Sequence, residues 1–529
     1  MFTSTRTGNN ARVYNDPADD FFNPAWNTVM RILIADDEYL ARSGLRSMLE
    51  ELNLPLEIIC EAANGEEMAL LVSRYLPDIA FVDIRMPKLN GLEAIRMSRM
   101  ASPHTQWFIL SGFPEFDYAQ EAIRLGVAGY LLKPVNPDEL RKVLSDFIEE
   151  DRKRIAAQNK QFERELIALS YGLTSPELEE ADPILSKSHF SGAMIYLDSY
   201  LEEKIKAERQ FKFCHTVQKL IDPRLDHHNR IALYVLPGGE LTTVGAWEPL
   251  QNTRAEQLVR GYFQVIEQEA RDSSSKDLAI TILISKECPT YQELQDQMER
   301  LQKLAPLRAA GGIGTVTDLT ALNKLAEKPG WLAFTTLVLN LCRCYQERSY
   351  SNYAKALQPL EKFMAGTPAF DHSLLTQPVA DFVQRSMNCP LESGQSLKSW
   401  IPVLRQHGEH LLNEMPKDEI QGLDLIDQVI AYIDQHYMFN TGIGQIAERF
   451  YITPNYLSTL FHKKTGVNFM SYLKKIRLLK AKELLADPKI QVQQVAEQVG
   501  YFSARHFARL FAEQFGCLPS EYRDRFKNR

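Results

Sequence analysis

The sequence lacks several features that would mark a membrane, secreted or zinc-binding protein. No apolar run in its 529 residues reaches the ~18 residues of a membrane span, and no charged-then-apolar leader opens the chain. The seven cysteines are scattered and odd in number, which is typical of a reducing compartment. Cys342 and Cys344 have no second Cys or His pair at zinc spacing, so we expect them to be buried helix residues. We therefore expect a cytoplasmic protein that does not bind membranes.

Length and charge both indicate several domains. At ~150 residues per domain, a chain of this length should contain about three or four. The whole chain carries a net charge of −8. Residues 422–529 hold 15 Lys and Arg against 10 Asp and Glu, so this end is +5 and the remainder is −13. A basic end on an acidic protein predicts a local site for a polyanion.

Apolar runs near the start of the chain end in polar side chains that could perform chemistry. The runs alternate with helical patterns, which predicts a parallel sheet with helices on both faces. The carboxyl ends of parallel strands meet at one sheet edge, so the side chains that follow the runs should form one site. These side chains are Asp36, Asp37, Asp83, Ser111 and Lys133. We expect the strands at 30–35, 57–61, 78–83, 106–111 and 129–132.

The predicted site suits phosphoryl transfer assisted by a metal ion. Three clustered carboxylates repel one another and need a cation, and oxygen ligands with open positions suit Mg²⁺. Asp36 and Asp37 would hold the ion together with Asp83 and the backbone carbonyl of Arg85. Asp83, at the centre, is placed as a nucleophile that becomes an aspartyl phosphate. Lys133 could pair with the phosphoryl oxygens as a point charge.

Ser111 could donate a hydrogen bond to the same phosphoryl oxygens. The motifs around these residues also resemble those of a known family. With Met86-Pro87, Gly91 and Lys133-Pro134, residues 30–150 resemble the receiver domain of a two-component response regulator. The resemblance implies a five-stranded flavodoxin-like fold, a sensor histidine kinase as phosphoryl donor and a cis Lys133-Pro134 peptide. It also implies that Ser111 moves toward the phosphate and that Tyr130 then repacks inward.

The flanks of this domain have simpler patterns. Residues 1–29 are polar and aperiodic, so we expect a disordered extension, and Met30 could be the natural start. A long, charged helical pattern begins near residue 136. It predicts that the last receiver helix continues into a helical connector over 151–184, which could pair with its copy in a dimer.

Residues 185–415 form a middle domain whose role the sequence does not specify. Strand patterns at 231–236 and 278–284, helical patterns at 256–270 and 291–304, and a mostly helical part at 330–415 indicate an α+β region. This order vaguely resembles degenerate cyclase-like middle domains. The Gly238-Gly239 and Gly311-Gly312 segments read as turns, because no metal acids or Lys-Ser/Thr accompany them. We expect His227 and His228 to be solvated.

The last hundred residues contain an internal repeat. Residues 446–448 match 495–497, and Leu460-Phe461 matches Leu510-Phe511. Each copy is a short helix, a tight turn and a second helix, which predicts two helix-turn-helix units. Thr453 before Pro454, and Ser503 in the second copy, are predicted N-caps. A helix over 470–485 that carries Lys474, Lys475, Arg477, Lys480 and Lys482 should join the units.

The second helix of each unit should enter the major groove of DNA. Helical spacing points Leu457, Leu460, Phe461, Phe507, Leu510 and Phe511 inward. The same spacing points Asn455, Ser458, Thr459 and His462 outward in the first copy, with Lys463 on a phosphate. In the second copy Arg505 and Arg509 face out four residues apart, where Arg can read guanine edges. Residues 422–527, including the closing segment 516–523, resemble the AraC-type DNA-binding domain, which implies two groove insertions from one protomer.

Together these patterns predict a multidomain, phosphorylation-dependent DNA-binding transcriptional regulator that is not an enzyme beyond its own aspartyl phosphorylation and dephosphorylation. The expected partners are a sensor histidine kinase and double-stranded DNA, with RNA polymerase as a candidate partner and a homodimer in the phosphorylated state. Two alternatives stay open: a ligand-gated transcription factor that senses through the middle domain, and a receiver-controlled nucleotide-cyclase-like enzyme.

Overall fold

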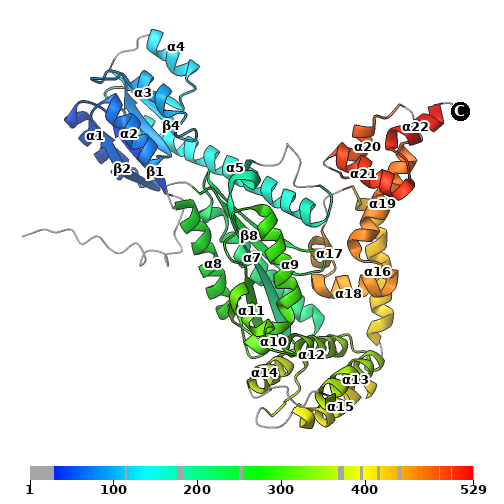
Figure 1. Cartoon of the computed structure of the whole chain (residues 1–529). Helices are drawn as coiled ribbons and strands as arrows, with labels where there is room; N and C mark the ends of the chain where they lie inside the picture. Colours follow the sequence, from blue (N-terminus) through cyan, green and yellow to red (C-terminus); the bar gives the residue numbers. More distant parts are fainter. Residues whose placement is uncertain are drawn as a thin grey trace, which may run out of the picture. The chain divides into compact units, whose positions relative to one another are not determined.

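The structure, a computed structural model, describes most of the chain as two compact units, one up to Phe147 and one from Ile148 (Figure 1). The described residues are 29–112, 116–174, 183–249, 254–366, 374–392, 397–413, 417–438, 442–487, 489–501 and 503–527. The predicted disordered extension lies, apart from Val29, outside these ranges. Within them, no helix combines the length and the apolarity that crossing a membrane requires.

The first unit is a five-stranded parallel sheet with helices between the strands. Its order, β2-β1-β3-β4-β5, is that of flavodoxin-like folds. The central strands are almost completely buried, as expected for strands whose two faces are both covered by helices. The strands are β1 (Met30–Ala35), β2 (Leu56–Ala62), β3 (Ile79–Asp83), β4 (Gln106–Ser111) and β5 (Gly129–Leu132), which confirms the prediction. The helices are α1 (Tyr39–Glu51), α2 (Gly65–Tyr75), α3 (Gly91–Ser98) and α4 (Phe116–Arg124).

A single helix, α5 (Pro137–Ser170), leaves the receiver and continues into the second unit, as predicted. Its residues after 150 lie along β7 (Asn229–Val235), the edge strand of a second sheet. The Asn159 side chain completes this edge, because it donates to the Ile231 carbonyl and accepts from the Ile231 amide, both at 2.8 Å. Ile155, Phe162 and Leu166 are buried on the same face of α5. This face, which could have paired with a second copy, is therefore covered within its own chain.

The second sheet has the order β10-β9-β6-β8-β7 and is antiparallel except for the β9–β10 pair. β7 and β9 (Leu278–Ile284) were predicted, but the central strands β6 (His189–Ser199) and β8 (Leu241–Trp247) were missed. β8 is interrupted by Thr242, Thr243 and Gly245, whereas β6 contains a five-residue apolar run, 193–197, that was overlooked. One face is covered by α7 (Glu203–Lys219) and α8 (Arg254–Ser273), the other by α5 and α9 (Tyr291–Leu304). The short elements are α6 (Pro183–Lys187), η2 (Asp222–Arg224), η3 (Ala305–Leu307), α10 (Arg308–Gly311) and β10 (Val316–Asp318).

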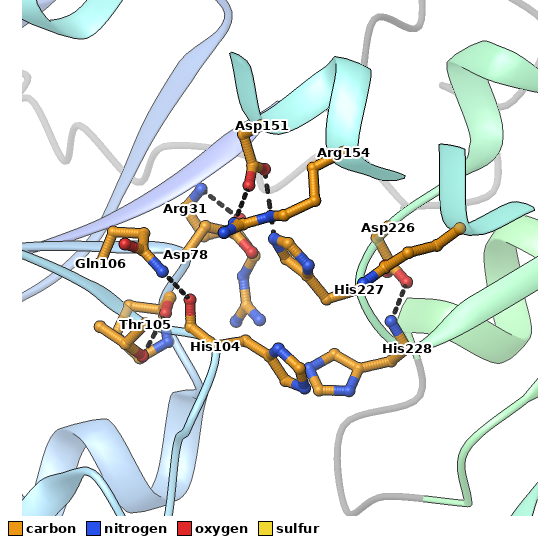
Figure 2. Close-up of polar contacts among 12 residues, drawn as sticks. Arg31, Asp78, His104, Thr105, Gln106, Asp151, Arg154, Asp226, His227 and His228 are labelled. Atoms are coloured by element: carbon orange, nitrogen blue, oxygen red, sulfur yellow. Dashed lines mark hydrogen bonds and ion pairs between the residues drawn. The ribbon is translucent and has the colours of Figure 1, made fainter. Parts of the chain in front are cut away.

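The prediction that His227 is solvated is wrong. Its side chain is only 9% exposed, and Nε2 lies 3.1 Å from Oδ2 of the buried Asp151 on α5 (Figure 2). Arg154 pairs with the other oxygen of that carboxylate. Burial alone would raise the pKa of Asp151, but His227 and Arg154 lower it overall. His228 is half-buried and lies 2.7 Å from Glu248. A carboxylate on α5, 76 residues earlier in the chain, therefore decides where His227 lies.

A helical subdomain follows the sheet, as predicted for 330–415. Cys342 and Cys344 are buried on one of its helices, which confirms the structural interpretation of the pair. Arg308 joins this subdomain to the sheet through a bidentate pair with Asp198, at 2.9 and 3.0 Å. The helices are α11 (Leu319–Ala326), α12 (Trp331–Gln346), α13 (Tyr350–Gly366), α14 (Thr376–Met387) and α15 (Leu397–Asn413).

The C-terminal region is all α-helical and contains the repeated pair of helices. Thr453 and Ser503 cap the second helix of each pair, as predicted, by accepting from the Tyr456 and His506 amides. Arg477, on the joining helix, is fully buried and donates to the Tyr437 and Gly500 carbonyls, each at 2.8 Å. The helices are α16 (Lys417–His436), α17 (Ile443–Arg449), α18 (Pro454–Thr465), α19 (Phe469–Leu484), α20 (Val492–Gln498), α21 (Ala504–Phe515) and α22 (Pro519–Lys527).

Candidate functional site

Three carboxylates meet at the carboxyl edge of the first sheet. β1 and β3 are adjacent and parallel, with Ala35 paired to Val82, so the residues that follow them emerge at the same edge. One oxygen from each of Asp36, Asp37 and Asp83 lies within 4.8 Å of the others. Asp36 and Asp83 are buried, whereas Asp37 is exposed. Such a cluster, open to solvent on one side, has the oxygen donors that a hard divalent cation prefers.

The Lys133 ammonium lies between two of these carboxylates. Its Nζ is 2.5 Å from Asp36 Oδ2 and 2.8 Å from Asp83 Oδ1. Burial raises the pKa of Asp83 against the opposing effect of Lys133, and the charges of Asp36 and Asp37 raise it further. Burial alone would lower the pKa of Lys133, but its two carboxylate partners raise it overall. The site thus contains one ammonium and three carboxylates, and a further cation would reduce its excess of negative charge.

The backbone after Asp83 is tightly folded. The Arg85 amide donates to Asp83 Oδ2 at 3.1 Å, and the Gly91 amide donates to the Ile84 carbonyl at 2.9 Å. A Cβ at Gly91 would lie 2.1 Å from the Asp83 carbonyl oxygen, so only glycine fits there. This turn fixes the orientation of the Asp83 carboxylate and brings Arg85 back beside it.

Ser111 and Tyr130 lie on neighbouring strands at the same side of the sheet. Ser111 is buried at the end of β4 and pairs with Leu132, and its carbonyl accepts from the Lys133 amide at 2.8 Å. The Tyr130 ring packs against the receiver core, and its buried hydroxyl has no hydrogen-bond partner among the described residues. The Lys133-Pro134 peptide is cis. Residues 113–115, which follow this strand, lie outside the described ranges.

Burial separates two faces of α18, the second helix of the first pair. Leu457 and Phe461 are in the core as predicted, whereas Leu460 is only half-buried against it. The residues predicted to face DNA form the opposite side. Among them Asn455, His462 and Lys463 are exposed, and Ser458 and Thr459 are half-buried.

The second pair separates its faces in the same way. Phe507, Leu510 and Phe511 are buried, and Arg505 and Arg509 are exposed. Arg509 lies 3.8 Å from Glu513 one turn on, a contact in solvent that contributes little and can be exchanged for another anion. Two exposed guanidinium groups one turn apart are suited to the edges of bases in a major groove.

Sequence reasoning missed the residues that contact the start of α18. Glu203 on α7 binds Thr453, 250 residues along the chain, and Gly239 lies against Asn455. It also grouped Arg477 with the four lysines of the joining helix and did not single it out, although the side chain is fully buried. No local pattern distinguishes these residues, because each is defined by a partner that is distant in sequence.

The folds and sites together define the class of protein. Residues 32–145 match the family of response regulator receiver domains, and residues 446–525 match a helix-turn-helix domain family. The chain thus carries a response regulator receiver domain and an AraC-type helix-turn-helix domain.

Individual relatives are regulatory proteins. The chain is similar to the uncharacterized transcriptional regulatory protein YesN of Bacillus subtilis, with 37% identity over 130 residues, 25% of this chain and 35% of that protein. It is 36% identical to the positive alginate biosynthesis regulatory protein of Pseudomonas aeruginosa over 132 residues, 25% of this chain and 52% of that protein. A solved structure, the REC domain of AraT, a response regulator from Geobacillus stearothermophilus, is 41% identical over 23% of this chain and 95% of that chain, with a TM-score of 0.22. The match covers only 35% of the length of the Bacillus subtilis protein and 52% of the length of the Pseudomonas aeruginosa protein.

Proposed function

We propose that this protein is a phosphorylation-dependent, DNA-binding transcriptional regulator of the two-component type, which accepts a phosphoryl group on Asp83. The observation that carries the proposal is the setting of Asp83. This carboxylate ends a central strand beside two further acids and Lys133, in a chain that also carries a helix-turn-helix domain. A sensor histidine kinase would be the phosphoryl donor and double-stranded DNA the target.

The acidic cluster fits a magnesium ion. Asp36, Asp37 and Asp83 supply hard oxygen ligands on a site that is open to solvent on one side. The Arg85 carbonyl would complete the protein's share of the ligands. A bound Mg²⁺ supplies positive charge that offsets the repulsion among the carboxylates and the phosphoryl oxygens.

The residues of the chain itself perform the remaining steps. Asp83 supplies the attacking oxygen, held in place by the Arg85 amide, and its bond to phosphorus forms as the phosphorus–nitrogen bond of the donor histidine breaks and the imidazole leaves with a proton taken from water. Lys133 keeps its contact with Asp36 and exchanges Asp83 Oδ1 for a phosphoryl oxygen, because the modified carboxylate has lost its charge. Ser111 donates its hydroxyl to a second phosphoryl oxygen, and Tyr130, which already packs against the core, shifts further inward as Ser111 moves.

The other end of the chain binds DNA. Arg505 and Arg509 read base edges from the second helix-turn-helix unit, and Lys463 contacts a phosphate from the first. Asn455, Ser458, Thr459 and His462 form the reading face of that first unit. The phosphorylated form would be a homodimer, and RNA polymerase a further partner. Since the apolar face of α5 is covered within its own chain, we expect the dimer to use another surface.

We propose the domain division 30–150 for the receiver, 151–184 for the connector, 185–415 for the middle domain and 422–527 for the DNA-binding domain. The middle domain is proposed to be non-catalytic. Its buried Asp198 is neutralised by Arg308, and the turn after β7 is occupied by α18. Binding to DNA would place the protein's action in the cytoplasm.

The test is the intact mass of the full chain after incubation with a small phosphoryl donor and Mg²⁺. We expect one phosphoryl adduct on the wild type, none on Asp83→Asn, and one on Asp138→Asn, which removes an exposed receiver aspartate. Binding of labelled duplex DNA, measured in parallel, should tighten only in the two proteins that carry the adduct. An adduct that persists in Asp83→Asn would contradict the assignment of the phosphoacceptor.

A further inference from the structure

The first helix-turn-helix unit is docked on the middle domain (Figure 1). The Tyr171 hydroxyl, at the end of α5, accepts from the Ile443 amide at 3.1 Å and donates to the Val235 carbonyl at 3.3 Å. A Cβ at Gly444 would lie 2.8 Å from Val235 Cγ2, so α17 lies directly on β7. Val235 packs against both the middle-domain core and the DNA-binding core. The two domains therefore share a continuous packed seam.

The seam continues over the N-terminus of α18. The Glu203 carboxylate accepts a hydrogen bond from the Thr453 amide at 3.1 Å and another from the Thr453 hydroxyl. The turn between β7 and β8 lies beside it. A Cβ on Gly239 would be 2.7 Å from both the N and the Cα of Asn455, so the two backbones are in direct contact. Thr453 is only 3% exposed as a result.

The reading face of α18 lines one wall of a cleft of about 1040 Å³. All five residues predicted to face DNA on this helix lie on it: Asn455, Ser458, Thr459, His462 and Lys463. The middle domain supplies the opposite wall, which includes Glu203, Lys206, Glu240 and Gln302. A helix that reads DNA lies inside a major groove ~12 Å wide, with DNA backbone on both sides of it, and a cleft with the middle domain opposite α18 leaves no room for that arrangement.

Glu203 occupies a position with a specific chemical meaning. The N-terminus of a helix carries free backbone amides and the positive end of the helix dipole, and it is a common site for a DNA phosphate. A carboxylate that accepts from the first amide of such a helix takes the place of that phosphate. Glu203 thus holds an amide that is suited to a DNA phosphate, and the side-chain face beside it lines the same cleft as the middle domain.

We propose that the middle domain masks the first helix-turn-helix unit by placing Glu203 and the β7–β8 turn on the N-terminus of α18, so that DNA binding requires this seam to open. The proposal rests on the proposed function and adds a step that regulates it. The mask acts on the first unit, whose reading face lines the cleft, whereas Arg505 and Arg509 of the second unit do not line it.

Helix α5 is placed to open the seam. Within the second unit it is fixed to the middle domain through Asn159, and its end holds Ile443 of the first DNA-binding unit through Tyr171. Just beyond it, the Gly172 carbonyl lies 2.7 Å from Nε2 of His506 on α21. The end of the helix that continues from the receiver therefore contacts both helix-turn-helix units.

Two variants with matched controls test the mask in the unphosphorylated full chain. Glu203→Ala removes the phosphate-like carboxylate, and Glu208→Ala makes the same charge change at an exposed position of the same helix. Gly239→Ala forces the turn away from α18. Gly312→Ala is its control, because Gly312 has nearly the same φ (+95° against +96°) but no atom within 4 Å of its Cβ position. The probe is a fluorescein-labelled random-sequence duplex at low salt, where phosphate contacts dominate binding.

We expect Glu203→Ala and Gly239→Ala to tighten binding while their controls do not. If the open form is roughly 10% of the molecules, complete release gives about a tenfold gain in affinity. Hydrogen exchange at the amides of residues 453–457, without DNA, should be faster in the two variants than in the controls. Phosphorylation should then add less affinity to the variants than to the wild type.

Equal affinity and equal hydrogen exchange of each variant and its control would overturn the mask. If, in that case, the wild type still binds DNA more tightly when phosphorylated, the proposed function stands alone. If phosphorylation changes nothing but the variants still bind more tightly than their controls, the mask stands and the proposed function fails. Absence of binding by every protein would overturn both.

Discussion

The replacement of Arg477 by methionine should destabilise the DNA-binding domain, although the side chain is predicted to touch no DNA. Arg477 is fully buried and donates to the carbonyls of Tyr437, before the first unit, and Gly500, in the turn of the second. Hydrogen bonds from a charged group contribute ~1.5–3 kcal/mol each, so the pair contributes ~3–6 kcal/mol. Burial opposes this by lowering the pKa of Arg477 to about 10, which corresponds to a cost of about 3 kcal/mol.

The two terms largely offset each other, so the loss comes mainly from the two carbonyls that methionine leaves without a donor. Each is partly buried, which puts its cost near the low end of ~1–3 kcal/mol. We expect Arg477→Met to lower the free energy of unfolding of this domain by about 2 kcal/mol, or its melting temperature by roughly 10 °C. Lys480→Met, on the exposed face of the same helix, should stay within about 0.5 kcal/mol of wild type.

The assay is hydrogen exchange of α19 and α20 in the full chain, read by mass spectrometry with scanning calorimetry alongside. A uniform loss of protection across both helices in Arg477→Met is the expected result. If Arg477→Met and Lys480→Met are equally stable, the burial of the guanidinium does not hold the two repeats together and the reasoning is refuted.

Three further outcomes are expected. Burial raises the pKa of Asp83, so folding disfavours its ionised form. Without divalent cations, the stability of the receiver should therefore fall as the pH rises through that pKa. Urea titrations measure this fall, and Asp83→Asn should abolish it. Arg308→Met leaves Asp198 buried and unpaired and should cost about 3–5 kcal/mol, much of which the added Asp198→Asn should restore in thermal unfolding. Burial, with a contribution from the Arg509 charge, lowers the pKa of His506. The stability of the DNA-binding domain should therefore fall as the pH drops below about 6.5, the ordinary pKa of histidine. Hydrogen exchange of α21, measured at several pH values, tests this.

Local patterns in the sequence were sufficient for the elements that carry the sites. Continuous apolar runs predicted the central receiver strands β1, β3 and β4 because strands covered on both faces need no polar side. Asp83 could be placed beside Asp36 because adjacent parallel strands end at one edge. Thr453 and Ser503 could be identified as caps because a cap depends only on the residues that follow it.

The same patterns failed where burial depends on a distant partner. β8 was missed because it is central in its sheet yet rich in small and polar residues, such as Thr242, Thr243 and Gly245. His227 was predicted to be solvated but pairs with Asp151, and nothing in the local sequence distinguishes the buried Arg477 from the lysines on the same helix. In each case the side chain is ordinary in sequence and its environment is built by another segment.

Local residue patterns therefore specify the identity of the parts: a strand edge with three carboxylates and a lysine, and two repeated helix pairs with opposed apolar and polar faces. They do not specify which polar face lies opposite another domain. Arg505 and Arg509 are exposed outside the cleft, whereas the face that begins at Asn455 lines it and the Asn455 backbone contacts Gly239. The physical reason is that helix periodicity determines which residues share a face, whereas the cover on that face comes from contacts such as Glu203 to Thr453, which join segments 250 residues apart.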